Sequence, residues 1–215
     1  MQKNLESCLK ALAEEDWRNI SNSIVYVRYS QALEVLKKAG FEVDSRNDGF
    51  IGMCFVDHLE GLSFYVIAAA HIRDNNIFVS KENKSSRLIF KAVALKDCLY
   101  LNQENIEVDL TRYYSYAGAI MNEFEEPFEE AVAIRDITEL DDFRSPFNPD
   151  EIEVLLIGKA FGQKRIQVRA ERFGENCLYG IIVSEPDGTT GFSKGDEIDF
   201  MLVEREGWFS TVHLC

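Results

Sequence analysis

Short runs of β-branched and aromatic residues, each bounded by turn-forming residues, recur along most of this 215-residue chain. From Gly49 onward they predict strands, because Val, Ile, Phe and Tyr favour extended backbone and the breaks between runs have hairpin length. The expected strands of the first half cover 50–56, 62–72, 76–80, 87–95 and 98–102. Their short separations favour an antiparallel meander.

Two helices are expected before this meander. Leu5, Leu9 and Leu12 recur at near-helical spacing, which predicts a short amphipathic helix within 5–17. A second helix is expected over 30–39, where a serine can cap its start and a glycine directly follows its end. Both helices are expected to pack on the sheet formed by the meander.

A change of character follows the meander. Residues 111–145 are rich in acidic and aromatic side chains and predict a helical connector, interrupted at Pro127. Two prolines within 144–150 disfavour regular structure, so this stretch is the best candidate for a linker. The expected domains are therefore 1–145, an α+β domain with its acidic connector, and 151–215, a small all-β domain.

The C-terminal segment again shows strand-like runs joined by glycine-bearing turns. The runs cover 152–157, 165–172, 177–184, 197–204 and 208–213. About 65 residues with this pattern predict a small barrel or curled sheet. The expected fold class is accordingly α+β, with N-terminal helices packed on an antiparallel β-meander and a small C-terminal β-barrel-like unit.

The charge of the chain limits its partners. A formal net charge of −14 repels nucleic-acid phosphates and anionic membrane surfaces and favours a basic partner. Acidic and basic residues number 16 and 13 in 1–110, 10 and 3 in 111–150, and 11 and 7 in 151–215. Half of the negative excess therefore belongs to the middle segment, although acidity that only serves solubility would give the same balance.

The cysteines indicate a reducing environment. Five cysteines stand far apart, without a Cys-x-x-Cys pair, so neither a disulfide framework nor a metal site is expected. The first 17 residues lack the apolar core of a signal peptide, and no apolar run approaches the length of a membrane span. We expect a cytoplasmic protein without membrane contact.

The sequence contains no enzyme signature in the structural context that its chemistry requires. No Gly-x-Gly-x-x-Gly dinucleotide motif occurs, and the one Gly-x-Ser-x-Gly match, at 191–195, leads into a predicted strand and not into the strand-to-helix turn that a nucleophile motif needs. The stretch 191–200 contains glycines, a lysine and acids, but their order fits neither a phosphate loop nor a calcium loop. We therefore expect no cofactor and name no catalytic residue.

The acidic connector is the best candidate for a binding surface. Aromatic anchors within a rim of carboxylates suit a basic protein partner, whereas the simpler interpretation is a helix with its aromatics packed inward. This predicts a non-enzymatic interaction protein that occludes its partner, a physical description that immunity proteins and inhibitors of basic proteins share by charge and size. The candidate residues are Glu125, Glu126, Glu129, Glu130, Tyr113, Tyr116 and Phe128.

Two alternative functions remain open from the sequence. The first is an enzyme or ligand-binding module with a pocket between the two units and His58, His71 or His213 as its titrating group. The second is nucleic-acid binding by the C-terminal unit through Arg165 and Arg169, a possibility that the negative charge of the chain disfavours.

Overall fold

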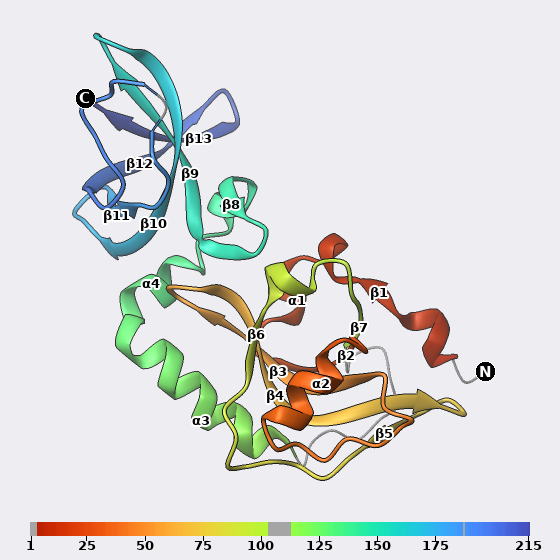
Figure 1. Ribbon diagram of the computed structural model, residues 1–215. Helices are drawn as coiled ribbons and strands as arrows, with labels where there is room; N and C mark the ends of the chain where they lie inside the picture. The colour runs from red at the N-terminus through yellow and green to blue at the C-terminus, as the bar shows by residue number, and fades with distance from the viewer. Residues whose placement is uncertain (1–3, 103–112, 187) are drawn as a thin grey trace. The chain divides into compact units, whose positions relative to one another are not determined.

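The structure is a computed structural model that describes residues 4–102, 113–186 and 188–215, apart from five side chains in helical segments: Ser115, Tyr116, Ala117, Met121 and Glu126. The chain forms two compact units, Met1–Phe124 and Glu125–Cys215 (Figure 1). Strands make up 44% and helices 23% of the structure, so the fold is mostly β. The expected α+β class, with N-terminal helices packed on a meander, is therefore wrong.

The N-terminal segment explains this correction. Instead of one amphipathic helix it contains two 3₁₀ turns, η1 (Leu5–Cys8) and η2 (Leu12–Glu14), on either side of strand β1 (Lys10–Ala11). Strand β1 pairs antiparallel with β7 (Leu99–Asn102). Edge pairing satisfies the backbone hydrogen bonds of this segment, and this tertiary interaction overrides the helical spacing of the leucines. The second expected helix is present as α2 (Ala32–Lys38).

The N-terminal unit is built on one antiparallel sheet. Its strands are ordered β1-β7-β2-β3-β4-β5, and β6 pairs with a further part of β4. The remaining strands are β2 (Ser23–Arg28), β3 (Gly49–Asp57), β4 (Gly61–Arg73), β5 (Asn76–Val79) and β6 (Ile89–Lys91). Among the described residues, the unit also contains the short helical segments α1 (Trp17–Ile20) and η3 (Ala92–Leu95). The longer α3 (Tyr114–Glu125) follows and ends at the first residue of the next unit.

The central strands of this sheet are buried along nearly their whole length. Every residue of β3 except Asp57 is buried, which matches a sequence that reads as a continuous apolar run. On one face, Ile51, Met53 and Phe55 pack in the same core cluster as Ile120 of α3. The sheet therefore forms the centre of the unit, with core packing on both faces.

The C-terminal unit is a closed barrel. In the part of the unit that the structure describes, five strands follow one another as antiparallel neighbours, and the last then pairs with the first. Each of the four antiparallel pairings reverses the strand direction, so the fifth strand runs parallel to the first. The closing pair is accordingly parallel, with Val212 beside Leu155. These strands are β9 (Asn148–Gly158), β10 (Gly162–Phe173), β11 (Leu178–Ile182), β12 (Glu197–Arg205) and β13 (Trp208–Leu214).

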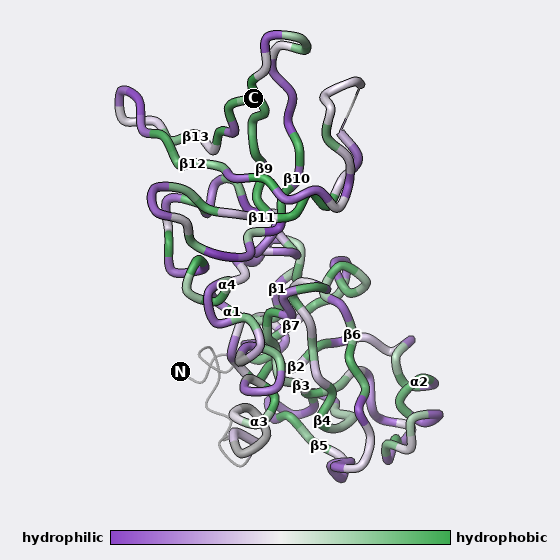
Figure 2. Tube along the Cα trace, turned by 90° about the vertical axis from the view of Figure 1, so that its left-hand side faces the viewer, coloured by the Kyte–Doolittle hydropathy of each residue, from purple (hydrophilic) through white to green (hydrophobic). Residues whose placement is uncertain are grey.

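Alternation along the barrel strands fills its interior. Ile152, Val154 and Leu156 of β9 are fully buried, whereas the residues between them are half-buried. Figure 2 shows hydrophobic residues along the strands of this unit and hydrophilic residues in many of its loops. The barrel core thus follows the period of two that its sequence indicates.

Buried arginines hold the helical segments of this unit to the barrel. Arg135 follows α4 (Glu129–Ile134) and binds Asp150 of β9 through Nε–Oδ1 and Nη2–Oδ2 distances of 2.8 and 2.7 Å. Arg144, in β8 (Arg144–Ser145), donates to the carbonyl oxygens of Ile134 and Pro149 and pairs with Asp141 of η7 (Thr138–Phe143). The stretch 144–150, where the sequence favours a linker, contains β8, the start of β9 and Asp150 of the buried ion pair.

Breaking the Arg135–Asp150 pair should destabilise the unit strongly. We expect Arg135→Met to lower the free energy of unfolding by about 3–5 kcal/mol, because it leaves a buried carboxylate without its partner. Urea unfolding followed by circular dichroism measures this. Arg165→Met is the matched control, since the Arg165 side chain is 74% exposed in its pair with Glu153, and we expect it to cost at most about 1 kcal/mol. Equal losses in both variants would contradict the assigned role.

A carboxylate in the N-terminal unit is held in its ionised form. Burial opposes ionisation of Glu15, but hydrogen bonds from Tyr100, Asn19 and Lys10 outweigh it and lower the pKa of Glu15 below its usual 4.5. Burial and the same contact with Glu15 raise the pKa of Tyr100. Glu15 thus fixes the segment before α1 to strand β7.

The lowered pKa of Glu15 makes the free energy of unfolding depend on pH in a defined direction. The stabilisation from Glu15 is complete above its unfolded pKa near 4.5 and is lost as the pH falls through the lower folded value. We expect Glu15→Gln to cost on the order of 1 kcal/mol at pH 7 and less at pH 3. Urea unfolding of both proteins between pH 3 and 7 tests this, and a constant difference would contradict it.

Candidate protein-binding site in the C-terminal unit

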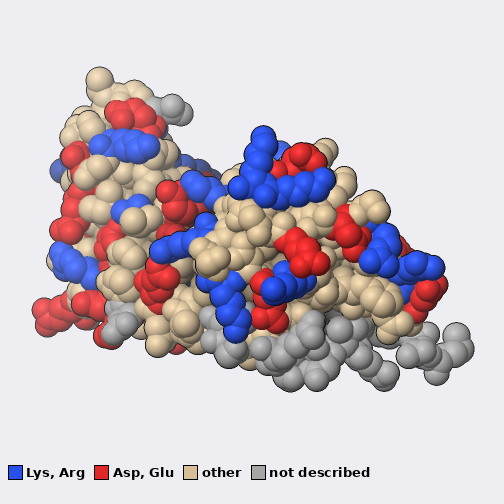
Figure 3. All heavy atoms as spheres, turned by 60° about the horizontal axis from the view of Figure 1, so that its bottom comes forward, with Lys and Arg blue, Asp and Glu red and all other residues tan. Residues whose placement is uncertain are grey.

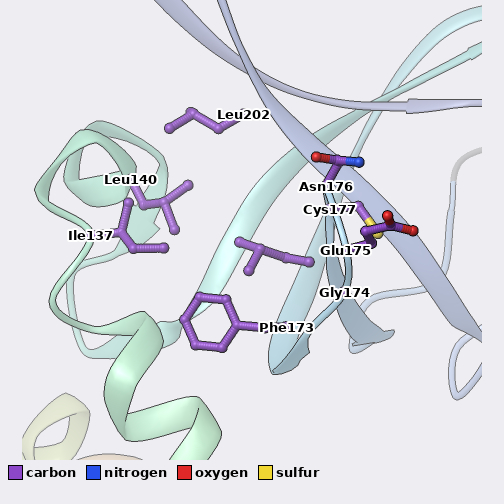
Figure 4. Close-up of a pocket in the computed structure, with 9 residues that line it drawn as sticks. Ile137, Leu140, Phe173, Gly174, Glu175, Asn176, Cys177 and Leu202 are labelled. Atoms are coloured by element: carbon purple, nitrogen blue, oxygen red, sulfur yellow. The ribbon is translucent and has the colours of Figure 1, made fainter.

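An apolar hollow of about 270 Å³ opens on the C-terminal unit (Figure 4). Its walls come from the segment after α4, from the turn between β10 and β11, and from β12. Figure 4 shows Ile137, Leu140, Phe173 and Leu202 around a common space. The lining residues are Ile137, Leu140, Phe173, Gly174, Glu175, Asn176, Cys177, Leu178 and Leu202.

The turn between β10 and β11 shapes one wall. The amide of Gly174 donates to the carbonyl oxygen of Cys177 at 2.8 Å, which closes the turn. A Cβ atom at Gly174 would lie 2.6 Å from Cys177 Sγ and 2.8 Å from Tyr179 Cε2, so only glycine fits here without a shift. Glu130 of α4 accepts a hydrogen bond from the Phe173 amide at 3.1 Å, which joins the helix to this wall.

Carboxylates lie in the lining of the hollow and on or next to the segments that supply its walls. Glu175 is part of its lining, and Glu130 contacts the Phe173 backbone. Asp136 and Glu139 are exposed directly beside the lining residues Ile137 and Leu140, and Glu129 is exposed on α4. We call these five side chains the rim carboxylates: Glu129, Glu130, Asp136, Glu139 and Glu175.

The whole unit carries most of the negative charge of the chain. Glu125–Cys215 contains 20 acidic and 9 basic residues, whereas Met1–Phe124 contains 17 and 14, so −11 of the −14 belongs to the unit with the hollow. Among its described residues, five arginines lie within 4.0 Å of carboxylates: Arg135, Arg144, Arg165, Arg169 and Arg172. A cation that approaches the hollow therefore meets an attractive field.

The size and lining of the hollow suit an apolar side chain. Its volume lies below the roughly 300–1,000 Å³ of sites for drug-sized ligands. In the described part of the chain, no group of three or more His, Cys, Asp or Glu side chains is placed to hold a metal ion. The hollow can accept one large apolar residue, while its rim can bind Lys or Arg on either side.

The structure places the candidate acidic residues in different settings. Glu129 and Glu130 are both exposed on α4, and Glu130 accepts a hydrogen bond from the backbone amide of Phe173, which lines the hollow. Glu125 instead lies 3.4 Å from Arg135, with its side chain 19% exposed, and so serves the buried ion pair. The side chain of Glu126 lies outside those that the structure describes.

Two of the three candidate aromatic anchors have described side chains, Tyr113 and Phe128, and neither is fully exposed. Tyr113 is 1% exposed and packs in the core of the N-terminal unit, which leaves it unable to anchor a partner from this position. Phe128 is half-buried in the C-terminal unit. The side chain of Tyr116 is outside the described set.

The two histidines of the N-terminal unit are not brought together, and the third belongs to the C-terminal unit. His58 lies in the turn between β3 and β4, whereas His71 stands at the opposite end of that hairpin. Both are buried, and the His71 ring stacks on Phe78 with Nδ1 3.4 Å from Asn47 Nδ2. His213 belongs to the other unit, where its Nδ1 lies 2.6 Å from the Asp199 carbonyl oxygen. This arrangement does not support catalysis by paired histidines.

The arginines proposed for nucleic-acid binding are paired within the unit. Arg165 lies 2.6 Å from Glu153, and Arg169 lies 2.8 Å from Glu171. On the face drawn in Figure 3, Lys and Arg side chains lie among Asp and Glu and do not form a continuous basic area. These contacts reduce the attraction that phosphate binding requires.

A second hollow, of about 890 Å³, lies in the N-terminal unit. Its walls are mainly the polar loop 80–85, with Gly40, Glu42 and Val79. Lysines and glutamates occur together in this lining, and one valine supplies its large apolar side chain. It therefore offers neither a defined charge nor an apolar floor, and the C-terminal hollow is the stronger candidate.

Sequence reasoning did not identify the apolar walls of the hollow. Ile137 and Leu140 fall within the predicted helical connector, and Leu202 falls within a predicted strand, so none of them stands out as a site residue. The available signal was weak: apolar residues stand beside a turn that contains Gly174, next to an acidic segment. Only the folded barrel brings these three segments together.

Comparisons with known proteins give no family. No family model, no curated protein and no solved structure matches the chain. Within the described ranges, no helix is long and apolar enough to cross a membrane. Function is therefore argued from the geometry of the site.

Proposed function

We propose that this is a non-enzymatic interaction protein whose C-terminal unit binds a basic segment of another protein. The observation that carries the proposal is an apolar hollow with the carboxylate of Glu175 in its lining, on a unit with a net charge of −11. An apolar side chain of the partner would occupy the hollow, and neighbouring Lys or Arg side chains would pair with the rim carboxylates.

The two parts of this site contribute differently to binding. Full burial of a leucine-sized side chain stabilises a complex by about 1.5–3 kcal/mol. Each exposed rim ion pair adds only about 0–1 kcal/mol, but the summed field accelerates association and selects against acidic competitors. The hollow therefore supplies affinity, and the rim supplies selectivity.

Occlusion is the mode of action that this surface favours. A basic active site or nucleic-acid-binding surface on the partner would be covered when its cationic segment binds the rim. The role would be that of an inhibitor or immunity-type protein, in keeping with the acidity of the chain. The apolar anchor of the complex would be a side chain of the partner that enters the hollow, in place of the aromatic anchors expected on this chain.

Selection of peptides by the full-length protein tests the proposal. From a random library of 12-residue peptides at 50 mM salt, we expect enrichment of cationic sequences that contain a large apolar residue. Affinity should fall steeply as the salt concentration rises, because exposed charges are screened. Enrichment of neutral or acidic peptides would contradict the proposal.

Matched variants locate the binding surface. We expect the combined change of Glu129, Glu139 and Glu175 to Gln to weaken binding of a selected peptide at least fivefold and to flatten its salt dependence. The control removes the same charge from exposed positions of the N-terminal unit: Glu14→Gln, Glu42→Gln and Asp97→Asn. Fluorescence anisotropy measures both, and equal effects would place binding elsewhere.

A further inference from the structure

The hairpin of β12 and β13 has two faces that differ in their surroundings. In its antiparallel register Leu202 stands opposite Thr211, and Glu204 stands opposite Phe209. Because side chains alternate along a strand, these four residues share one face. Leu202 lines the hollow, so Glu204 and Phe209 continue the surface that begins there.

Exposure increases along this face toward the turn. Thr211 is 2% exposed, whereas Phe209 is 39% exposed and Glu204 is exposed. Glu206 and Gly207 both have positive φ values, 55° and 81°, as in the tight two-residue turns that fix hairpin register. Glu204 and Phe209 are therefore held opposite each other on a regular hairpin. Glu204 lies two residues beyond Leu202, which is roughly 6.6 Å along β12.

A carboxylate directly opposite an aromatic ring suits a cation. The ring of Phe209 can take a guanidinium or ammonium group on its face, and Glu204 can pair with the same charge. The hollow, by contrast, suits an apolar side chain. The two neighbouring positions thus differ in the chemistry that they select.

We infer that the bound segment is an extended chain with an apolar residue and an Arg or Lys two positions apart. In an extended peptide, residues i and i+2 point the same way and stand about 6.6 Å apart, which matches the step from the hollow to Glu204 and Phe209. The inference rests on the proposed function and specifies the spacing that its partner carries.

The opposite face of the hairpin carries side chains that can serve as controls for Glu204 and Phe209. Val203, Arg205 and Trp208 point away from the hollow side, and Trp208 is 79% exposed.

A second copy of this chain is a poor occupant for the hollow side, because each C-terminal unit carries a net charge of −11 and two copies would repel. The negative charge instead fits the cationic residue of the inferred segment.

Two peptides of equal composition test the spacing with the full-length protein. The first, Gly-Ser-Arg-Ser-Leu-Ser-Arg-Ser-Gly, presents an arginine two positions from leucine in both chain directions. The second, Gly-Ser-Ser-Arg-Leu-Arg-Ser-Ser-Gly, places both arginines next to leucine. With fluorescein-labelled peptides at 50 mM salt, we expect the first to bind at least fivefold more tightly.

Variants of the hairpin test whether Glu204 and Phe209 cause the difference in affinity between the two peptides. Glu204→Gln and Phe209→Ala should each reduce the affinity for the first peptide toward that for the second. Trp208→Ser and Glu206→Gln, which change an exposed aromatic and a carboxylate elsewhere on the same hairpin, should leave it unchanged. Circular dichroism confirms that all four variants are folded.

The outcomes separate the inference from the proposed function. If both arginine peptides bind equally, and the combined rim variant still weakens them, the spacing is overturned while the proposed function stands. If neither binds more tightly than Gly-Ser-Glu-Ser-Leu-Ser-Glu-Ser-Gly, both are overturned. An equal loss in the Trp208→Ser variant would assign the cation to the other face and overturn the inference.

Discussion

The buried ion pair between Arg135 and Asp150 determines how the helical part of the C-terminal unit meets its barrel. Both residues lose nearly all contact with water, which costs several kcal/mol for each ion, and the two parallel hydrogen bonds offset that cost only in this geometry. The end of α4 is therefore fixed against β9. Because Ile137 and Leu140 follow directly, one wall of the hollow depends on this pair.

Much of the strand content could be predicted from the sequence. The runs of β-branched residues in the C-terminal segment overlap β9–β13. Gly40, the expected stop signal of the second helix, follows shortly after the end of α2. The expected helix at the N-terminus was wrong because its backbone pairs with β7, a contact between residues about 90 positions apart. Local spacing carries no information about such pairing, so the fold class was misjudged.

The candidate site was less accessible to sequence reasoning than the strands. Acidic residues at 129–130 could be named because charge is visible in the sequence, and Glu130 contacts the backbone of Phe173. Burial could not be read in the same way: Tyr113 is in the core, and Glu125 supports a buried arginine. The hollow itself requires three separate segments to meet, and that arrangement exists only after the barrel has closed. Its function as a binding site stays a prediction.

Parallel pairing of β13 with β9 also constrains how the C-terminal unit forms during synthesis. Strand β9 leaves the ribosome long before β13. One edge of β9 therefore has no partner at 155–157 until the last strand of the unit arrives, although β8 already pairs with the same edge at Asn148 and Ile152. An unpaired edge is a template for association between chains. Closure of this barrel is thus a non-local, late event, and the nascent unit depends on its final strand for protection against aggregation.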